Sequence, residues 1–131
     1  MRVLLADDSA LILERLRTMV SRNDRVEIVG AMRNGTDTLR ALRTLKPDLA
    51  IVDNKMPGLS GLEVLNEIRK EDRHLKFILL TYYATDYYRQ LAEEAGVDYF
   101  LSKVDNFEMV AQLISQMTEQ EEFRGNLPWV S

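Results

Sequence analysis

The sequence predicts an α/β fold in which helices cover both faces of a parallel sheet. Five short apolar runs recur at nearly even spacing along the 131 residues, and segments with helical periodicity separate them. Runs that are apolar throughout are typical of parallel strands buried on both faces, and right-handed crossovers restrict the possible topologies. Because a chain of this length builds one core, we expect a single doubly wound α/β sandwich.

Each expected strand is rich in Val, Ile or Leu. In chain order the strands are Val3 to Ala6, Val26 to Val29, Leu49 to Val52, Phe77 to Leu80 and Tyr99 to Leu101. The first and last helices have the clearest apolar stripes, formed by Ile12, Leu16, Met19 and Val20, and by Phe107, Val110, Ala111, Ile114 and Met117. Weaker stripes predict three further helices, over Thr36 to Leu45, Gly61 to Lys70 and Thr85 to Ala95.

Turn-forming residues support these boundaries. They occur in Lys46-Pro47-Asp48, Met56-Pro57-Gly58 and Ala95-Gly96-Val97. The polar run 118–122 continues or frays the last helix, and Gly125 and Pro128 indicate a short tail. We predict one domain over residues 1–122 and a C-terminal tail over 123–131, with no output domain. Trp129 in that tail either folds back onto the domain or binds a partner.

Composition narrows the possible classes of protein. No apolar stretch is long enough to span a bilayer and no signal peptide is evident, so we expect a cytoplasmic protein. The absence of cysteine excludes disulfides, zinc-thiolate sites and thiol catalysis, and His74 is the single histidine. Any bound metal must therefore prefer oxygen ligands. A net charge of -4 without a basic block argues against direct binding of nucleic acid.

Polar residues follow four of the predicted strands. Asp7 and Asp8 follow the first, Asp53 the third, Thr81 the fourth and Lys103 the fifth. The carboxyl ends of parallel strands share one edge, where ligands bind, so these side chains should converge. Two like charges 4 Å apart repel by about 4 kcal/mol at an effective dielectric of 20, so the cluster needs a cation, and Mg²⁺ suits carboxylate oxygens. Alternatively, Asp7 or Asp8 caps the first helix and Asp53 begins a turn.

Over roughly residues 2 to 120 the chain resembles the receiver domain of two-component response regulators. The matching pieces are Val3-Leu4-Leu5-Ala6-Asp7-Asp8-Ser9, Asp53-Asn54-Lys55-Met56-Pro57-Gly58, Leu79-Leu80-Thr81, and the run from Ala95 to Lys103. The resemblance implies a flavodoxin-like sheet of strand order 2-1-3-4-5 with five helices on two faces. It also implies a stand-alone signalling module of the chemotaxis-regulator type, and not an enzyme beyond promoting its own phosphorylation and dephosphorylation.

The resemblance further implies a role for each residue of the acidic pocket. Asp53 accepts a phosphoryl group from a histidine kinase or histidine phosphotransferase. Asp8 binds Mg²⁺ directly, Asp7 acts mainly through a bound water, and the backbone carbonyl of Lys55 completes the protein ligands.

Physical chemistry supports roles for the remaining polar residues. Phosphoryl transfer needs an in-line nucleophile and cations that neutralise the phosphoryl oxygens, and Lys103 supplies one such cation. The Thr81 hydroxyl can donate to a phosphoryl oxygen, and its inward movement would shift the start of the next helix. In the family, an aromatic residue three before the lysine changes its exposure with this movement; here it is Phe100, which is alternatively a plain core residue.

Two residues depart from the family pattern. Val104 replaces the usual proline, and because a non-proline cis bond costs about 3 kcal/mol we expect a trans Lys103-Val104 bond and a less firmly held lysine. Tyr82 stands where a small side chain is usual. We hypothesise that its ring slows loss of the phosphoryl group; alternatively, it turns outward and matters little. We expect the Lys55 ammonium to face solvent.

Four of the five tyrosines surround the predicted fourth helix. These are Tyr82, Tyr83, Tyr87 and Tyr88. Because tyrosine is enriched in interfaces, we expect a docking surface for a protein partner, and possible homodimerisation through the fourth helix, fifth strand and fifth helix that the family commonly uses. Alternatively, two of the rings pack inward and the others are incidental.

Other functions fit the same fold. Tyr82 and Val104 could mark a pseudo-receiver that acts as a phosphorylation-independent interaction module, and the chain could be the receiver portion of a longer DNA-binding regulator. A flavin-binding electron carrier fits poorly, because Asp7 and Asp8 are acidic where a phosphate would bind. A magnesium-dependent aspartyl phosphatase would need a second acid where Ser9 stands.

Overall fold

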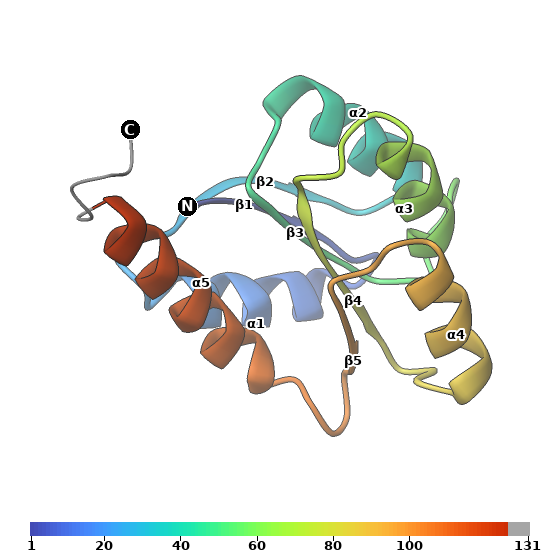
Figure 1. The fold of residues 1–131 in the computed structure, drawn as a ribbon. Coiled ribbons are helices and arrows are strands. Elements are labelled where there is room, and N and C mark those ends of the chain that lie inside the picture. The colour runs from blue at the N-terminus through green and yellow to red at the C-terminus, as the bar shows by residue number, and fades with distance from the viewer. Residues whose placement is uncertain (126–131) are drawn as a thin grey trace.

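A computed structural model describes residues 1–125, with side chains described through residue 121. Strands and helices alternate along the whole described chain (Figure 1). The elements are β1 (Arg2–Ala6), α1 (Ala10–Ser21), β2 (Glu27–Met32), α2 (Gly35–Leu45), β3 (Leu49–Val52), α3 (Gly61–Arg69), β4 (Lys76–Thr81), α4 (Asp86–Glu94), β5 (Tyr99–Ser102) and α5 (Met109–Gly125).

The five strands form one parallel sheet in the order β2-β1-β3-β4-β5, which confirms the predicted fold class. The register aligns the strand ends: Ala6 lies opposite Val52, and Thr81 lies opposite Ser102. The residues that follow β1, β3, β4 and β5 therefore meet at one side of the sheet. We call this side the carboxyl edge.

Helices cover both faces of the sheet, with α1 and α5 on one face and α2, α3 and α4 on the other (Figure 1). Alternate strand residues point to opposite faces, so Leu5 and Ile51 pack under α1 and α5, whereas Leu4 and Val52 pack under the other three helices. Both faces of the central strands are thus buried, which explains their uninterrupted apolar sequences. Within residues 1–125, no helix is both long and apolar enough to cross a bilayer.

Polar residues cap the N-termini of α1 to α4. Several helix boundaries differ from those predicted. Asn34 accepts a hydrogen bond from the Asp37 backbone, so α2 begins one residue before the predicted Thr36. Thr85 caps α4 in the same way, and that helix therefore begins at Asp86. The third helix ends at Arg69, one residue earlier than predicted.

The second strand was placed too early by the sequence. It was predicted to end at Val29 before Gly30, but β2 runs to Met32. The pairing with β1 skips Val29, because Val3 lies opposite Ile28 and Leu4 lies opposite Gly30. Such a bulge breaks the regular pattern of a strand, and a glycine within a strand often marks one.

The last helix begins at Met109, two residues after the predicted Phe107. It continues to Gly125 and so includes the first three residues of the segment 123–131 that the sequence predicts as a tail. Trp129 lies outside the described residues.

Candidate functional site

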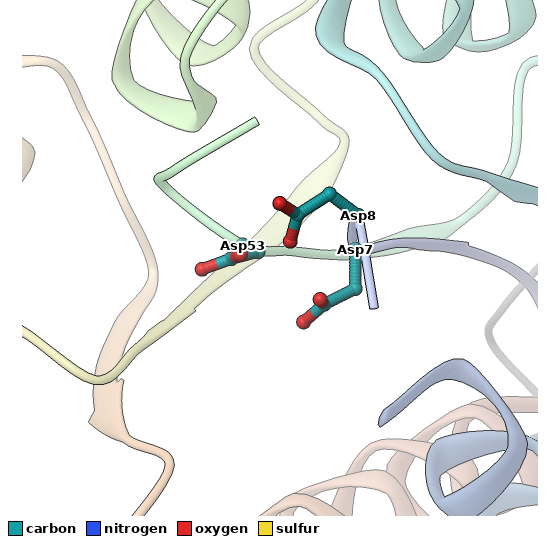
Figure 2. Close-up of side chains that lie close together, drawn as sticks. All are labelled: Asp7, Asp8 and Asp53. Atoms are coloured by element: carbon teal, nitrogen blue, oxygen red, sulfur yellow. The ribbon is translucent and has the colours of Figure 1, made fainter. Parts of the chain in front are cut away.

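Three carboxylates converge at the carboxyl edge. Asp7 and Asp8 follow β1, and Asp53 follows β3 (Figure 2). One carboxylate oxygen from each lies within 4.8 Å of those of the other two. Asp7 and Asp53 are buried, whereas Asp8 is exposed and opens the cluster to solvent.

Lys103 joins this cluster from the end of β5. Its ammonium lies 2.5 Å from Oδ2 of Asp7 and 3.2 Å from Oδ2 of Asp53, and its side chain is only 2% exposed. The Lys103-Val104 peptide bond is trans, as predicted. Lys103 nevertheless points into the cluster, and the side chains of Ser102 and Asn106 accept hydrogen bonds from the loop after β5. A looser hold on Lys103 stays a prediction.

Backbone hydrogen bonds position two of the three aspartates, Asp7 and Asp53. The Asp53 N–H donates to the Ala6 carbonyl, and the Asp7 N–H donates to the Met32 carbonyl. Gly61, which begins α3, lies so close to the Asp53 carbonyl that a Cβ atom there would overlap it. Neighbouring backbone groups therefore hold the main chain at the two strand ends.

The aspartates do not have the alternative structural roles considered from the sequence, which were capping of the first helix and the start of a turn. Ser9 caps α1, accepting a hydrogen bond from the Ile12 N–H, so neither Asp7 nor Asp8 is the cap. Asp7 instead accepts a hydrogen bond from the Ser9 N–H at 2.9 Å. Among the described residues, Lys103 is the ion-pair partner of the Asp53 carboxylate, and no hydrogen bond joins this carboxylate to a nearby backbone N–H. The Asp53 side chain is therefore not used to hold a turn.

The cluster holds three carboxylates but only one ammonium, that of Lys103, so the carboxylates repel one another. Burial, followed by the Asp7 charge, raises the pKa of Asp53 to about 6, although Lys103 partly opposes both effects. Burial also raises the pKa of Asp7, opposed mainly by its hydrogen bond with Lys103. A divalent cation would relieve this repulsion. The donor set of carboxylate oxygens, with one exposed side for water ligands, fits Mg²⁺.

Thr81 and Tyr82 line the same edge. Thr81 is buried, and its Oγ1 accepts a hydrogen bond from the Tyr83 N–H at 3.1 Å, which leaves its own hydroxyl proton free to donate. The Tyr82 ring is 55% exposed, yet its centroid lies 4.8 Å from the Lys103 ammonium. Tyr82 therefore flanks the pocket and does not simply turn away from it.

Lys55 is exposed, in agreement with the expectation that it faces solvent. Its ammonium lies 5.7 Å from the centroid of the Tyr83 ring. Lys55, Tyr83 and Tyr88 line a cavity of about 360 Å³ beside the acidic cluster.

The tyrosines divide into two groups. Tyr82, Tyr83 and Tyr87 are more than half exposed, while Tyr88 is half-buried against the core and meets Tyr87 edge to face at 5.4 Å between centroids. Phe100 is buried, and the Arg89 guanidinium stacks over its ring at 4.8 Å. The exposed rings thus form a surface at the β4–α4 connection and on α4.

Sequence reasoning missed three residues that build the site. Ser102 and Asn106 hold the lysine loop, and Arg33 donates two hydrogen bonds to the Asp8 carbonyl, at 2.8 and 3.2 Å. Ser102 and Asn106 are common loop residues, and only their spacing in a short polar segment hints at a capping role. Arg33 lies far from Asp8 in sequence, so no local pattern identifies it.

Three carboxylates and a lysine at the carboxyl edge of a parallel α/β sheet suit a divalent cation and a negatively charged ligand, and comparison with known proteins gives the class of domain. The family described as the response regulator receiver domain matches residues 3–115. The transcriptional regulatory protein DesR of Bacillus subtilis is 34% identical over 112 residues, which are 86% of this chain and 55% of DesR. The response regulator GacA of Pseudomonas aeruginosa is 29% identical over 116 residues, 88% of this chain and 54% of GacA.

Solved structures show the same similarity. The REC domain of AraT from Geobacillus stearothermophilus superposes with a TM-score of 0.81 at 27% identity, covering 95% of this chain and 98% of that one. A LuxR-family DNA-binding response regulator from Staphylococcus aureus gives a TM-score of 0.80 at 28% identity, covering 89% and 98%. The chain belongs to the receiver-domain family of two-component response regulators. It spans about half the length of the curated relatives that it matches.

Proposed function

We propose that this receiver domain is phosphorylated on Asp53 with the help of Mg²⁺. The observation that carries the proposal is the placement of the Lys103 ammonium against Asp53 inside a cluster of three carboxylates. Asp53 is the acid at the end of the central strand β3, and its carboxylate has no other partner among the described residues. It is therefore available as a nucleophile for an incoming phosphoryl group.

Each neighbour of Asp53 has a distinct task. Asp8 and Asp53 would hold Mg²⁺ directly, Asp7 would hold it mainly through a water, and the Lys55 backbone carbonyl would complete the protein ligands. Bound Mg²⁺ supplies positive charge that neutralises phosphoryl oxygens during transfer. Lys103 supplies the second positive charge, and the free hydroxyl proton of Thr81 can donate to a phosphoryl oxygen.

Phosphorylation would reach the surface through Thr81. Its Oγ1 is bonded to the Tyr83 N–H, so a shift of Thr81 toward a phosphoryl group would pull on the segment that leads into α4. Phe100 lies under Arg89 of α4 and would respond to the same movement. The exposed Tyr82, Tyr83 and Tyr87, with the adjoining Tyr88, would form a docking surface for a downstream protein or a second copy through α4, β5 and α5.

A histidine kinase or histidine phosphotransferase would supply the phosphoryl group, as family membership implies. The first test is incubation with acetyl phosphate and Mg²⁺ followed by intact-mass measurement. We expect the mass to increase by one phosphoryl group in the wild type and to stay constant in the Asp53→Asn variant. Lack of a mass increase, with normal folding, would favour a pseudo-receiver. The position of Lys103, retained without the usual proline, supports the phosphoacceptor instead.

A second candidate is the receiver portion of a longer DNA-binding regulator. The observation that favours it is the length of the curated relatives, roughly one and a half times that of this chain, among them a transcriptional regulatory protein. An antibody raised against the domain should then detect, in the source cells, a band well above 15.1 kDa. A band at the mass of this chain would favour the stand-alone module.

A further inference from the structure

The backbone N–H groups of the loop that follows β5 all donate hydrogen bonds within the protein. Two short-range pairs close it: the Ser102 N–H donates to Oδ1 of Asn106 at 3.1 Å, and the Asn106 N–H donates to the Ser102 carbonyl at 2.9 Å. Oγ of Ser102 accepts from the N–H groups of both Val104 and Asp105, each at 3.1 Å. The remaining N–H, that of Lys103, donates to the Thr81 carbonyl at 2.9 Å. All five consecutive N–H groups from 102 to 106 therefore have acceptors.

The geometry points to Ser102 as a positioning residue: we propose that its hydroxyl, backed by Asn106, holds the trans loop that points the Lys103 ammonium at Asp53. Ser102 is buried and directly precedes the lysine. The hydroxyl oxygen gathers the two N–H groups that follow Lys103, so the chain turns sharply after the lysine. The side chain of Lys103 then has one direction left, into the acidic cluster.

This arrangement substitutes for a rigid proline. A proline at position 104 would have no N–H to donate to Ser102, so the hydrogen bond at 3.1 Å belongs to the sequence with Val104. The side chain of Val104 is itself exposed, which leaves the backbone bond as its contribution to the loop. Ser102 and Asn106 thereby explain why Lys103 stays buried although the family's usual residue is missing.

The first experiment measures the position of Lys103 without any phosphorylation. Reductive methylation followed by peptide mass spectrometry gives the labelling rate of each lysine, with the exposed Lys70 as the internal standard. Because a buried amine reacts only when the loop opens, Ser102→Ala should raise the Lys103 rate about tenfold relative to Lys70. Ser102→Thr, which keeps the hydroxyl, should stay within about twofold of the wild type. Ser21→Ala, at the exposed end of α1, is the matched control.

Asn106 gives an independent variant should Ser102→Ala fold poorly. Asn106→Ala removes the acceptor for the Ser102 N–H and should also unmask Lys103, whereas Asn106→Asp keeps an acceptor oxygen and should not. Equal protection of Lys103 in the wild type, Ser102→Ala and Asn106→Ala would overturn the proposal.

The second experiment tests the consequence for chemistry and rests on the proposed function. Ser102→Ala should slow labelling by acetyl phosphate, and it should have no further effect when Lys103 is already replaced by alanine. An equal slowing in both backgrounds would show a general structural role and would overturn the assignment. A wild type that takes up no phosphoryl group, together with unmasking of Lys103 in Ser102→Ala, would end the proposed function but not the positioning role.

Discussion

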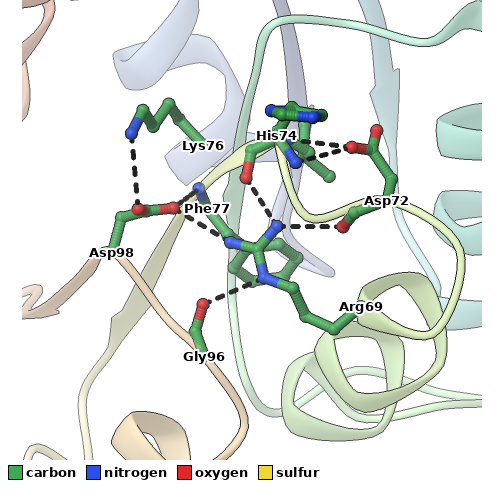
Figure 3. A network of polar contacts seen from close by, with 8 residues as sticks. Arg69, Asp72, His74, Lys76, Phe77, Gly96 and Asp98 are labelled. Carbon is green, nitrogen blue, oxygen red and sulfur yellow. Dashed lines mark hydrogen bonds and ion pairs between the residues drawn. The ribbon is translucent and has the colours of Figure 1, made fainter.

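Charged residues gather at both edges of the sheet, but their surroundings differ. The amino edge, where the strands begin, is the side opposite the carboxyl edge. At the amino edge, Arg69 donates to the carbonyls of Gly96, Asp72 and Leu75 and to the carboxylate of Asp98 (Figure 3). At the carboxyl edge, three carboxylates share one ammonium and the pKa of Asp53 is raised. Charges with matched partners stabilise a fold, whereas charges gathered in excess store repulsion that a ligand can relieve.

At the amino edge the carboxylate of Asp98 has several partners of its own. Asp98 accepts from Arg69 at 3.0 Å and from the Phe77 N–H at 2.7 Å, and the Lys76 ammonium lies 3.8 Å away. This network ties the end of α3 to the beginnings of β4 and β5. It lies on the opposite side of the sheet from Asp53, so it can be altered without touching the candidate site.

Breaking the Arg69 network at the amino edge should cause the largest change in stability. Arg69→Ala removes four hydrogen bonds and leaves the partly buried Asp98 without its main partner, so we expect the free energy of unfolding to fall by about 3 kcal/mol. Urea denaturation measures it. Arg73→Ala, in the exposed turn after α3, should change stability by less than about 0.5 kcal/mol and serves as the control. If Arg69→Ala changed stability as little as Arg73→Ala, the network would not contribute to the stability of the fold.

Neutralising one carboxylate at the carboxyl edge should instead stabilise the protein. In metal-free buffer at neutral pH, Asp53→Asn should raise the free energy of unfolding by up to about 3 kcal/mol, because a pKa of about 6 in place of 3.8 means that the folded state disfavours the carboxylate. The sign follows directly: wild-type stability should increase as pH falls from 7 toward 5, where the folded protein takes up the proton first. The variant should show a smaller increase, because only the raised pKa of Asp7 remains to contribute to it.

Asp98→Asn is the matched substitution at the other edge. It loses the charge that faces Arg69 and Lys76, so it should lower stability by about 1 kcal/mol. If both Asp→Asn substitutions changed stability in the same direction, the contrast between the edges would fail.

Mg²⁺ should remove part of the strain at the crowded edge. At ten times its dissociation constant, a ligand that binds only the folded state stabilises it by about 1.4 kcal/mol. We expect thermal unfolding of the wild type to shift upward accordingly with MgCl₂, and that of Asp8→Ala to shift little. Equal shifts in both would mean that the ion acts elsewhere, and CaCl₂ at the same concentration tests selectivity for the smaller ion.

The sequence predicted the sheet and the meeting of Asp7, Asp8, Asp53 and Lys103 because both follow from rules that act over short stretches. Apolar runs mark strands, and parallel strands bring their carboxyl ends together. The amino-edge network was not predicted, because Arg69 and Asp98 are 29 residues apart and neither interrupts a periodic pattern. The hydrogen bonds around Lys103 were not predicted for a related reason: a missing proline is visible in the sequence, whereas the bonds made by Ser102 and Asn106 depend on the loop's conformation.

Tyr82 offers the smallest and most specific test of the carboxyl edge. Its ring flanks Lys103 and is half exposed, so it would hinder, but not close, the path of water to a phosphorylated Asp53. Removing the ring with Tyr82→Ala should speed phosphoaspartate hydrolysis about threefold, equivalent to about 0.6 kcal/mol of activation free energy. The lifetime is followed by intact mass after acetyl phosphate is removed.

Two variants separate shielding by the ring from other effects. Tyr82→Phe keeps the ring beside Lys103 and should preserve the lifetime, whereas loss of the hydroxyl alone would matter if a hydrogen bond were responsible. Tyr87→Ala removes a more exposed ring from α4 and should leave the lifetime unchanged. If Tyr82→Ala hydrolyses at the wild-type rate, the ring does not shield the site, and the departure from a small residue at this position would then serve the docking surface alone.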